Sequence, residues 1–323
     1  MILHERWFLD ESRFPVQFDT WSSANSLLPI AVAVGVTAVA TLIYRARGRH
    51  SVVPGPVALG MPWENYVRLL TWVPLVIGVH MGVTLLVSGI SRQLFIPNLV
   101  LPVNFLGGLL GMIEIAIALS FIYGALTRPA AAVLAFIWLV GTMVFGPLRL
   151  IEHTEILGIA FFLFVAGRGP LSFDMALDKL NRPIRPLIHY AVPVLRIALG
   201  VGLTVVAFTE KIWNVPMALA FLTDHNFNFF PYIGMPSIDD TKFVLLAGTV
   251  ELIVGLMLIA GTYVRLVILI ALIPFNLTLP FMGWRELVGH LPTYGVLALL
   301  LLWGDERPGE RGALVRALLG ARA

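Results

Sequence analysis

The stretch from Gly248 to Gly304, which begins GTVELIVGLMLIAGTYVR, matches the stretch from Gly111 to Gly167, which begins GMIEIAIALSFIYGALTR. The two align without a gap at one constant shift, which places Glu251 on Glu114, Arg265 on Arg128 and His290 on His153. Apolar segments match one another by composition alone. Rare ionisable residues in one register, with glycines between them, are harder to obtain by chance. We therefore interpret the chain as a duplicated transmembrane unit.

The composition is that of a membrane protein. The chain is 58% hydrophobic and 13% charged, with a mean hydropathy of +0.88, whereas soluble domains carry about 25% charged residues. Apolar runs of about 20 residues, long enough to cross a bilayer, recur along the whole length. These runs are continuous rather than alternating, which predicts membrane-spanning α-helices and not a β-barrel.

Several classes of site are excluded or unsupported. The chain has no cysteine, which excludes disulfides, thiolate nucleophiles, iron–sulfur ligation and cysteine-zinc sites. The run Glu152-His153-Thr154-Glu155 contains metal-ligand types, but no second ligand at helical spacing completes a metal motif. No phosphate loop or dinucleotide fingerprint is present. We predict no metal site and no nucleic-acid partner.

The apolar runs predict an all-α fold of about nine transmembrane helices, in which two four-helix bundles form a parallel repeat behind an N-terminal helix. The expected domains are an N-terminal segment with one helix and a loop (1–66), unit one (67–167), a basic connector (168–187), unit two (188–304) and a basic tail (305–323). The predicted spans are 27–44, 67–90, 103–123, 129–145, 150–166, 188–208, 243–261, 266–279 and 287–303. The aromatic-rich lead before residue 27 is expected to lie in the membrane interface.

Most of the 22 lysines and arginines fall on one side of this topology, the side that carries Arg45, Arg47 and Arg49. Basic loops are retained in the cytoplasm. The sequence therefore predicts an outer N-terminus, a cytoplasmic C-terminus and a bacterial or archaeal cytoplasmic membrane. Gly124 and Gly261 are expected to end helices before tight turns, and the inner arginines Arg68, Arg128, Arg196 and Arg265 are expected to anchor the inner surface.

Ionisable residues recur at one depth. Glu251 precedes Arg265 by about four helical turns, and His290 precedes Gly304 by the same interval. At a rise of about 1.5 Å per residue, both should lie about 21 Å from the inner face. Glu210 and Lys211, which also lie about four turns beyond Arg196, join the same layer. Ionisable groups within a bilayer are costly unless they are paired, and they commonly mark functional sites.

From this layer we predict a catalytic group made of Glu251, Lys211, His290 and Glu210, with Lys211 paired to Glu251 and His290 as a hydrogen-bonding neighbour. Unit one offers Glu114, His153 and His80 as cofactor-binding candidates but has no matching lysine, so unit two is expected to hold the complete site. Structural alternatives stay open. The glutamates could join helices by hydrogen bonds, the histidines could cap helices, and Lys211 could extend its ammonium to the interface. Two histidines could also bind a haem or metal axially.

The external segment from Asn214 to Thr241 combines aspartates, a histidine and several aromatic residues. It is long for a loop, so it is expected to cover the outer end of the site or to lie in the interface. The corresponding segment of unit one, Ser91 to Pro102, is shorter. This asymmetry also favours unit two as the site.

Unit two resembles the DoxX family of four-span membrane proteins. The resemblance rests on Phe208-Thr209-Glu210-Lys211 at the end of the first helix, on Val250-Glu251-Leu252-Ile253-Val254-Gly255 leading to Gly261-Thr262-Tyr263-Val264-Arg265, and on a fourth apolar helix that ends at Gly304. Unit one carries Glu114 and Gly124-Ala125-Leu126-Thr127-Arg128 without the lysine. The tandem form departs from the single-unit pattern of the family.

The resemblance implies four-helix bundles and a redox-linked membrane role, because the related DoxD proteins are subunits of a thiosulfate:quinone oxidoreductase. We therefore expect quinone-linked oxidoreduction, with this chain as the enzyme or as its membrane subunit, quinone as the cofactor and a redox or extracytoplasmic protein as partner. The alternatives are a non-catalytic scaffold that docks such a partner, and a transporter of a small lipid or anion.

Overall fold

In the computed structural model, residues 4–176 and 182–304 are described, and every named element in these ranges is helical. Extended pairing within them is limited to one isolated bridge between Gln93 and Val100. Lys179 of the predicted connector and the predicted basic tail, 305–323, lie outside the described residues. The predicted all-α class is confirmed for the described chain.

The helices of the first half are α1 (Ala24–Ala46), α2 (Trp63–Thr71), α3 (Val73–Ile90), α4 (Phe105–Tyr123), α5 (Thr127–Phe145), α6 (Pro147–Ile151) and α7 (Thr154–Ala166). Those of the second half are α9 (Ala191–Val206), α10 (Val215–His225), α11 (Asp240–Ala260) and α12 (Val264–Trp303). A π-helical segment, η6 (Ala207–Ile212), continues α9. Short 3-10 turns are η1 (Glu5–Trp7), η2 (Glu11–Arg13), η3 (Phe18–Ser22), η4 (Phe173–Ala176), η5 (Ile188–Tyr190) and η7 (Phe230–Ile233).

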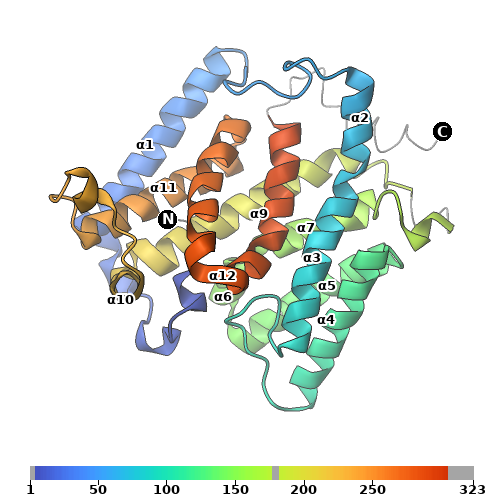
Figure 1. Ribbon diagram of the computed structural model, residues 1–323, viewed down its shortest axis with the longest axis horizontal. Coiled ribbons are helices and arrows are strands. Elements are labelled where there is room, and N and C mark those ends of the chain that lie inside the picture. The colour runs from blue at the N-terminus through green and yellow to red at the C-terminus, as the bar shows by residue number, and fades with distance from the viewer. Residues whose placement is uncertain (1–3, 177–181, 305–323) are drawn as a thin grey trace.

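The long element α12 turns back on itself, as Figure 1 shows. The turn is at Gly283, whose φ of 67° and ψ of −153° are not helical. A positive φ is accessible to glycine without a steric penalty, so the glycine lets two antiparallel helical arms follow one another directly. The two arms contain the two predicted spans 266–279 and 287–303.

Seven helical segments in the described part of the chain are long and apolar enough to cross a membrane. They comprise α1, α2 with α3, α4, α5, the segment from Ile188 to Ile212, α11 and α12, while α7 is an apolar helix of shorter length. These segments indicate an integral membrane protein. Six of them begin and end within a few residues of a predicted span, because the same apolar runs define both. The seventh, α12, covers two predicted spans, so the predicted count of nine is not confirmed.

Arginine side chains close several helix ends. Gly124 and Gly261 follow α4 and α11 with φ of 67° and 66°, which confirms their prediction as helix terminators. Beside Gly124, Arg168 donates hydrogen bonds to the carbonyls of Phe121 and Ile122, the latter at 2.9 Å. Beside Gly261, Arg196 donates to the carbonyls that end α11. A cation at a helix C-terminus satisfies free carbonyls and opposes the helix dipole.

The packing of the helices brings the two halves together. Within each half, α3 packs on α4 and α9 packs on α11. Between the halves, α7 packs on α9 and α12 packs on α3. The N-terminal helix α1 packs on α11 at the edge of the bundle (Figure 1). A single large apolar core spans both halves, and the candidate site lies beside it where α7, α9, α11 and α12 converge.

Candidate functional site

The N-terminal residues 4–7, which we call the plug, insert into the helical bundle. Glu5 is 0% exposed, Arg6 is 6% exposed and Trp7 is 4% exposed. The segment is held further along the chain by a hydrogen bond from the backbone N–H of Gln17 to the carbonyl of Trp213, at 2.8 Å. The prediction that this lead lies in the membrane interface is therefore wrong for the plug. Its charged side chains reach buried partners of opposite charge, which the interface could not provide.

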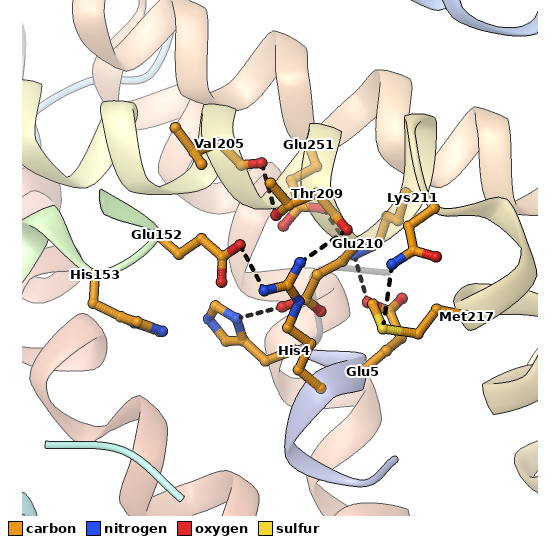
Figure 2. Close-up of polar contacts among 12 residues, drawn as sticks. His4, Glu5, Glu152, His153, Val205, Thr209, Glu210, Lys211, Met217 and Glu251 are labelled. Atoms are coloured by element: carbon orange, nitrogen blue, oxygen red, sulfur yellow. Dashed lines mark hydrogen bonds and ion pairs between the residues drawn. The ribbon is translucent and has the colours of Figure 1, made fainter. Parts of the chain in front are cut away.

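Lys211 is the centre of an ion cluster. Its Nζ lies 3.0 Å from Oε2 of Glu251 on α11 and 3.1 Å from Oε2 of Glu5 in the plug. All three side chains are at most 1% exposed. Figure 2 shows Glu5 and Glu251 approaching the lysine from opposite sides. The predicted pair of Lys211 with Glu251 forms, and the plug adds a second carboxylate that the sequence did not indicate.

The π-helical segment η6 explains how two consecutive charged residues both face the core. Glu210 is 0% exposed and Lys211 is 1% exposed, whereas consecutive side chains on an α-helix point in directions about 100° apart. The wider turn of a π-helix changes this spacing, and such segments occur frequently at functional sites. Gly248 of α11 allows the close approach, because a Cβ there would lie 3.0 Å from Cβ of Lys211.

Arg6 forms a second ion pair beside the first. Its Nη1 lies 3.2 Å from Oε1 of Glu152, which follows α6, and its Nη2 donates a 3.2 Å hydrogen bond to the carbonyl of Thr209 in η6. Both side chains of the pair are at most 5% exposed. The plug thus connects a residue of unit one to the first helix of unit two (Figure 2).

The His4 ring lies among the rings of Trp7, His153 and His290. His4 stacks on the Trp7 ring with centroids 4.5 Å apart, and its ring lies 5.0 Å from that of His153 and 5.4 Å from that of His290. Its Nδ1 lies 3.3 Å from Oε1 of Glu210. Gly289, next to His290, leaves space for this group, because a Cβ there would meet the Trp7 ring at 2.4 Å.

His290 connects the cluster to an apolar groove. Its Nδ1 lies 3.1 Å from the carbonyl and 3.3 Å from Oε1 of Glu286, and this carboxyl oxygen lies 3.4 Å from the hydroxyl of Thr278. Thr278 lines a groove of about 280 Å³, whose other walls are apolar and aromatic. The groove residues are Phe227, Phe229, Phe230, Phe243, Leu246, Ala247, Val250, Ile270, Ile273, Pro274 and Leu277.

The structure distributes the predicted site residues unequally. Glu251, Lys211, Glu210, His290 and His153 meet around the plug. The predicted hydrogen bond between His290 and the Lys211–Glu251 pair is absent among the described residues, since His290 bonds Glu286 on its own helix. The prediction that unit two alone holds the complete site is also wrong, because Glu152 and His153 of unit one take part.

Two predicted residues lie apart from this group. Glu114 is 0% exposed and accepts a 2.7 Å hydrogen bond from the backbone N–H of Phe95, in the loop after α3. His80 is half-buried, and its Nδ1 lies 2.7 Å from the carbonyl of Val76 one turn earlier. Neither contacts the cluster among the residues that the structure describes. Because neither residue lies in the cluster, the structure gives no support to their predicted cofactor-binding role.

The buried charges of the cluster do not balance. Among the described residues, two permanent cations, Lys211 and Arg6, stand against five buried carboxyl groups, those of Glu5, Glu152, Glu210, Glu251 and Glu286. An uncompensated charge inside a protein is costly and tends to be neutralised by proton binding. In the plug, the carboxyl group of Glu5 follows this rule. Burial raises the pKa of Glu5 to about 8, with Lys211 opposing and Glu210 reinforcing the shift.

Burial also lowers the pKa of His4 well below its usual value, and the nearby His153 and Lys211 act in the same direction. The imidazole is therefore neutral at pH 7. A neutral imidazole can both donate and accept a proton. His4 thus lies 3.3 Å from Glu210 and beside the rings of His153 and His290.

Sequence reasoning missed His4, Glu5, Arg6, Trp7, Glu152 and Glu286. The available signal was the run His4-Glu5-Arg6, three ionisable residues in a lead otherwise rich in aromatics. Three ionisable side chains need buried partners if the segment enters the bundle, and Glu152 was a charge without an assigned partner. Comparisons with protein-family models, curated proteins and solved structures found no match for this chain.

Proposed function

We propose that this protein is a membrane component of quinone-linked redox metabolism, in which the buried cluster exchanges protons with a quinone that enters through the apolar groove. The observation that carries the proposal is the series of close contacts from Thr278 in the groove through Glu286 to His290, whose ring lies 5.4 Å from that of His4 in the plug. A ligand with an apolar body and a polar, protonatable end matches such a series of contacts. A quinone has this chemistry, and the resemblance to DoxX proteins points to the same class.

The groove suits the apolar part of the ligand. Its volume of about 280 Å³ is near the lower end for small-molecule sites, about 300–1,000 Å³. Four phenylalanines line it, and two further lining residues, Ile273 and Leu277, are 66% and 56% exposed. In a membrane protein such an exposed apolar surface faces lipid. A quinone could therefore move from the bilayer into the groove without crossing water.

The buried cluster matches the polar, protonatable end of the quinone. Reduction of a quinone to a quinol takes up two electrons and two protons. In our proposal a redox protein partner supplies the electrons, and this chain supplies the protons. Glu286 contacts the groove residue Thr278 and His290, and His4, whose ring lies 5.4 Å from that of His290, contacts Glu210. Lys211 does not line the groove, so its role is to stabilise the buried carboxylate of Glu251.

We further propose that the fold is a tandem repeat of DoxX-like units, with nine spans if the two arms of α12 and the α6–α7 pair all cross the membrane. Equivalent glycines support the repeat. A Cβ on Gly82 of α3 would meet Cγ1 of Ile122 at 2.8 Å, and a Cβ on Gly200 of α9 would meet Cγ1 of Ile259 at 2.9 Å. Ile122 and Ile259 are related by the constant shift found in the sequence.

The contacts between the halves are reciprocal as well. Gly158 of α7 faces Ala198 of α9, where a Cβ would approach the alanine Cβ to 2.7 Å, and Gly295 of α12 faces the Cβ of His80 on α3 at 3.4 Å. Gly158 and Gly295 are related by the same shift. The last helix of each half thus packs on the first helix of the other, which supports a two-fold arrangement about the membrane normal. The predicted orientation, with the arginine-rich end in the cytoplasm, remains part of this proposal.

Binding is tested by filling the groove. We expect Val250→Phe to lower the amount of quinone that copurifies with the protein, because a larger side chain would occupy the groove. Val36→Phe, at a 44% exposed position on α1, is the matched control and should retain quinone. Organic extraction followed by chromatography measures the bound quinone. Equal quinone in the two variants, or none in the unaltered protein, would contradict the proposal.

Proton transfer is tested at Glu286. We expect Glu286→Gln to retain bound quinone but to slow quinone reduction about 100-fold, which is the scale of a lost general acid. The assay follows thiosulfate-driven reduction of a short-chain quinone in membranes, since thiosulfate is the donor that the DoxD resemblance implies. Asn276→Ala, an exposed polar residue on the same helix, should leave the rate unchanged. Full activity in Glu286→Gln would remove this residue from the pathway.

A further inference from the structure

A separate cavity lies at the arginine-rich end of the bundle, away from the plug. Its volume is about 490 Å³, and it is enclosed by the end of α1, by η5 and the start of α9, by the end of α11 and by both ends of α12. Arg45, Arg49 and Arg196 line it together with His189. No described residue of the lining is acidic. Among the described residues, the lining therefore carries positive charge without an acidic counter-ion.

The three guanidinium groups have different roles. Arg196 is committed to the carbonyls of Leu258 and Ile259 at the end of α11, which fixes its position. The side chains of Arg45 and Arg49 are exposed and form no hydrogen bond or ion pair with any described residue. A guanidinium presents several N–H donors in a planar arrangement that matches phosphate oxygens. Arg45 and Arg49, which bond no described residue, thus have N–H donors available for a phosphate group beside Arg196.

The turn after α1 is built to place Arg49 at the cavity. Gly48 and Arg49 both have positive φ, at 67° and 61°, and the backbone N–H of Arg49 donates a 2.8 Å hydrogen bond to the carbonyl of Tyr44. A left-handed conformation is uncommon for a residue with a side chain. Arg45, in the last turn of α1, and Arg49 both line the cavity, while Arg47 between them does not.

The remaining walls are apolar and aromatic. They include Ile188, Val192, Tyr190 and Trp303, and the wall residue Tyr44 packs edge-on against Tyr263 with ring centroids 4.9 Å apart. Next to the cavity, Leu42 of α1 is 66% exposed, as expected of a side chain that faces lipid. Basic groups at one side and apolar walls at the other match a lipid head group with the first part of its acyl chains, better than they match a free phosphate.

We infer that this cavity binds the phosphate head group of an anionic phospholipid, with Arg45 and Arg49 as its main ligands. Basic pockets between transmembrane helices are known to bind lipid head groups. The bound lipid would join α1 to unit two at the end where α1 has few buried contacts of its own. The site is independent of the plug and of the proposed quinone chemistry.

The test uses the full-length protein, delipidated in detergent and titrated with mixed micelles that contain phosphatidylglycerol or phosphatidylcholine. We expect phosphatidylglycerol to raise the melting temperature more than phosphatidylcholine does. In Arg45→Gln/Arg49→Gln the apparent affinity for phosphatidylglycerol should fall about 30-fold, the effect of losing two basic contacts at a membrane surface. The single variant Arg47→Gln is the matched control and should bind as the unaltered protein does.

Three results would overturn the inference. Equal stabilisation by the two lipids would show that the cavity does not select an anionic head group. An equal loss in Arg47→Gln would show that the basic surface attracts anionic lipid without a defined site. Equal stabilisation by glycerol phosphate or by inorganic phosphate would identify a soluble phosphate as the ligand in place of a lipid.

Discussion

Lys211→Met is expected to lower the free energy of unfolding by about 3–5 kcal/mol, because it leaves the buried carboxylate of Glu251 without its cation. Lys211 lies 3.0 Å from Glu251 and 3.1 Å from Glu5, and none of the three side chains is more than 1% exposed. Methionine fills a similar volume, so the loss reports charge rather than packing. Unfolding by heat or denaturant in detergent micelles measures the effect.

The control for this variant is an exposed ion pair on the same half of the chain. Lys242 lies 3.4 Å from Asp239, with side chains 62% and 59% exposed. Such surface pairs contribute about 0–1 kcal/mol, so Lys242→Met should change stability little. Combining Lys211→Met with Glu251→Gln should recover much of the loss, because the unpaired charge is removed. A Lys211→Met protein as stable as Lys242→Met would show that the cluster is solvated.

Gly289→Ala is expected to expel the plug from the bundle. The added Cβ would lie 2.4 and 2.5 Å from two carbons of the Trp7 ring, which is closer than non-bonded atoms allow. Trp7 is confined by His4 at 4.5 Å and by His290 at 4.7 Å between ring centroids, so it cannot move aside within the site. Overpacking of this kind costs about 1–3 kcal/mol, which raises the displaced population about 5-fold or more.

Trypsin cleavage after Arg6 reports the displacement. Arg6 is 6% exposed and paired with Glu152, so the bond is protected while the plug is inserted. Cleavage of a transiently opened segment follows the open population, so we expect cleavage to be about 5-fold faster or more in Gly289→Ala, detected by mass spectrometry of the fragment. Gly108→Ala, on α4 with nothing within 4 Å of the added Cβ, should cleave as the unaltered protein does. Equal rates in both would contradict the insertion of the plug.

The helices and one ion pair could be predicted from the sequence for simple physical reasons. Apolar runs of membrane-spanning length define helices whatever their tertiary contacts. Lys211 and Glu251 lie on two successive long helices of unit two, each about four helical turns from an arginine at the same end. Helical rise therefore places both at one depth, and the cost of burying either charge alone pairs them.

The plug could not be predicted, because it depends on contacts between distant parts of the chain. Glu5 and Lys211 are 206 residues apart, and η1 is only three residues long. Neither hydropathy nor periodicity indicates where such a short turn packs. The aromatic residues of the lead are also typical of an interfacial segment, which is the interpretation that the structure corrects for residues 4–7.

Local backbone geometry places two further pairs of site residues. The π-helical segment η6 turns both Glu210 and Lys211 inward, and no sequence rule we applied anticipates it. The break between α6 and α7 places Glu152 and His153 outside a regular helix, immediately before α7. Glu114, the counterpart of Glu251, bonds its own half through Phe95 because unit one has no lysine at that place.

The buried cluster is expected to hold a proton at neutral pH within the membrane protein, and the whole account depends on this. Infrared titration of the carboxyl C=O stretching band in proteoliposomes tests it most directly. Burial raises the pKa of Glu5 to about 8, so a protonated carboxyl band should be present at pH 7 and should diminish as the pH rises through about 8. Glu5→Gln should lose this titrating part of the band. A titrating band of the same size in Glu5→Gln, or no such band in the unaltered protein at pH 7, would contradict the account.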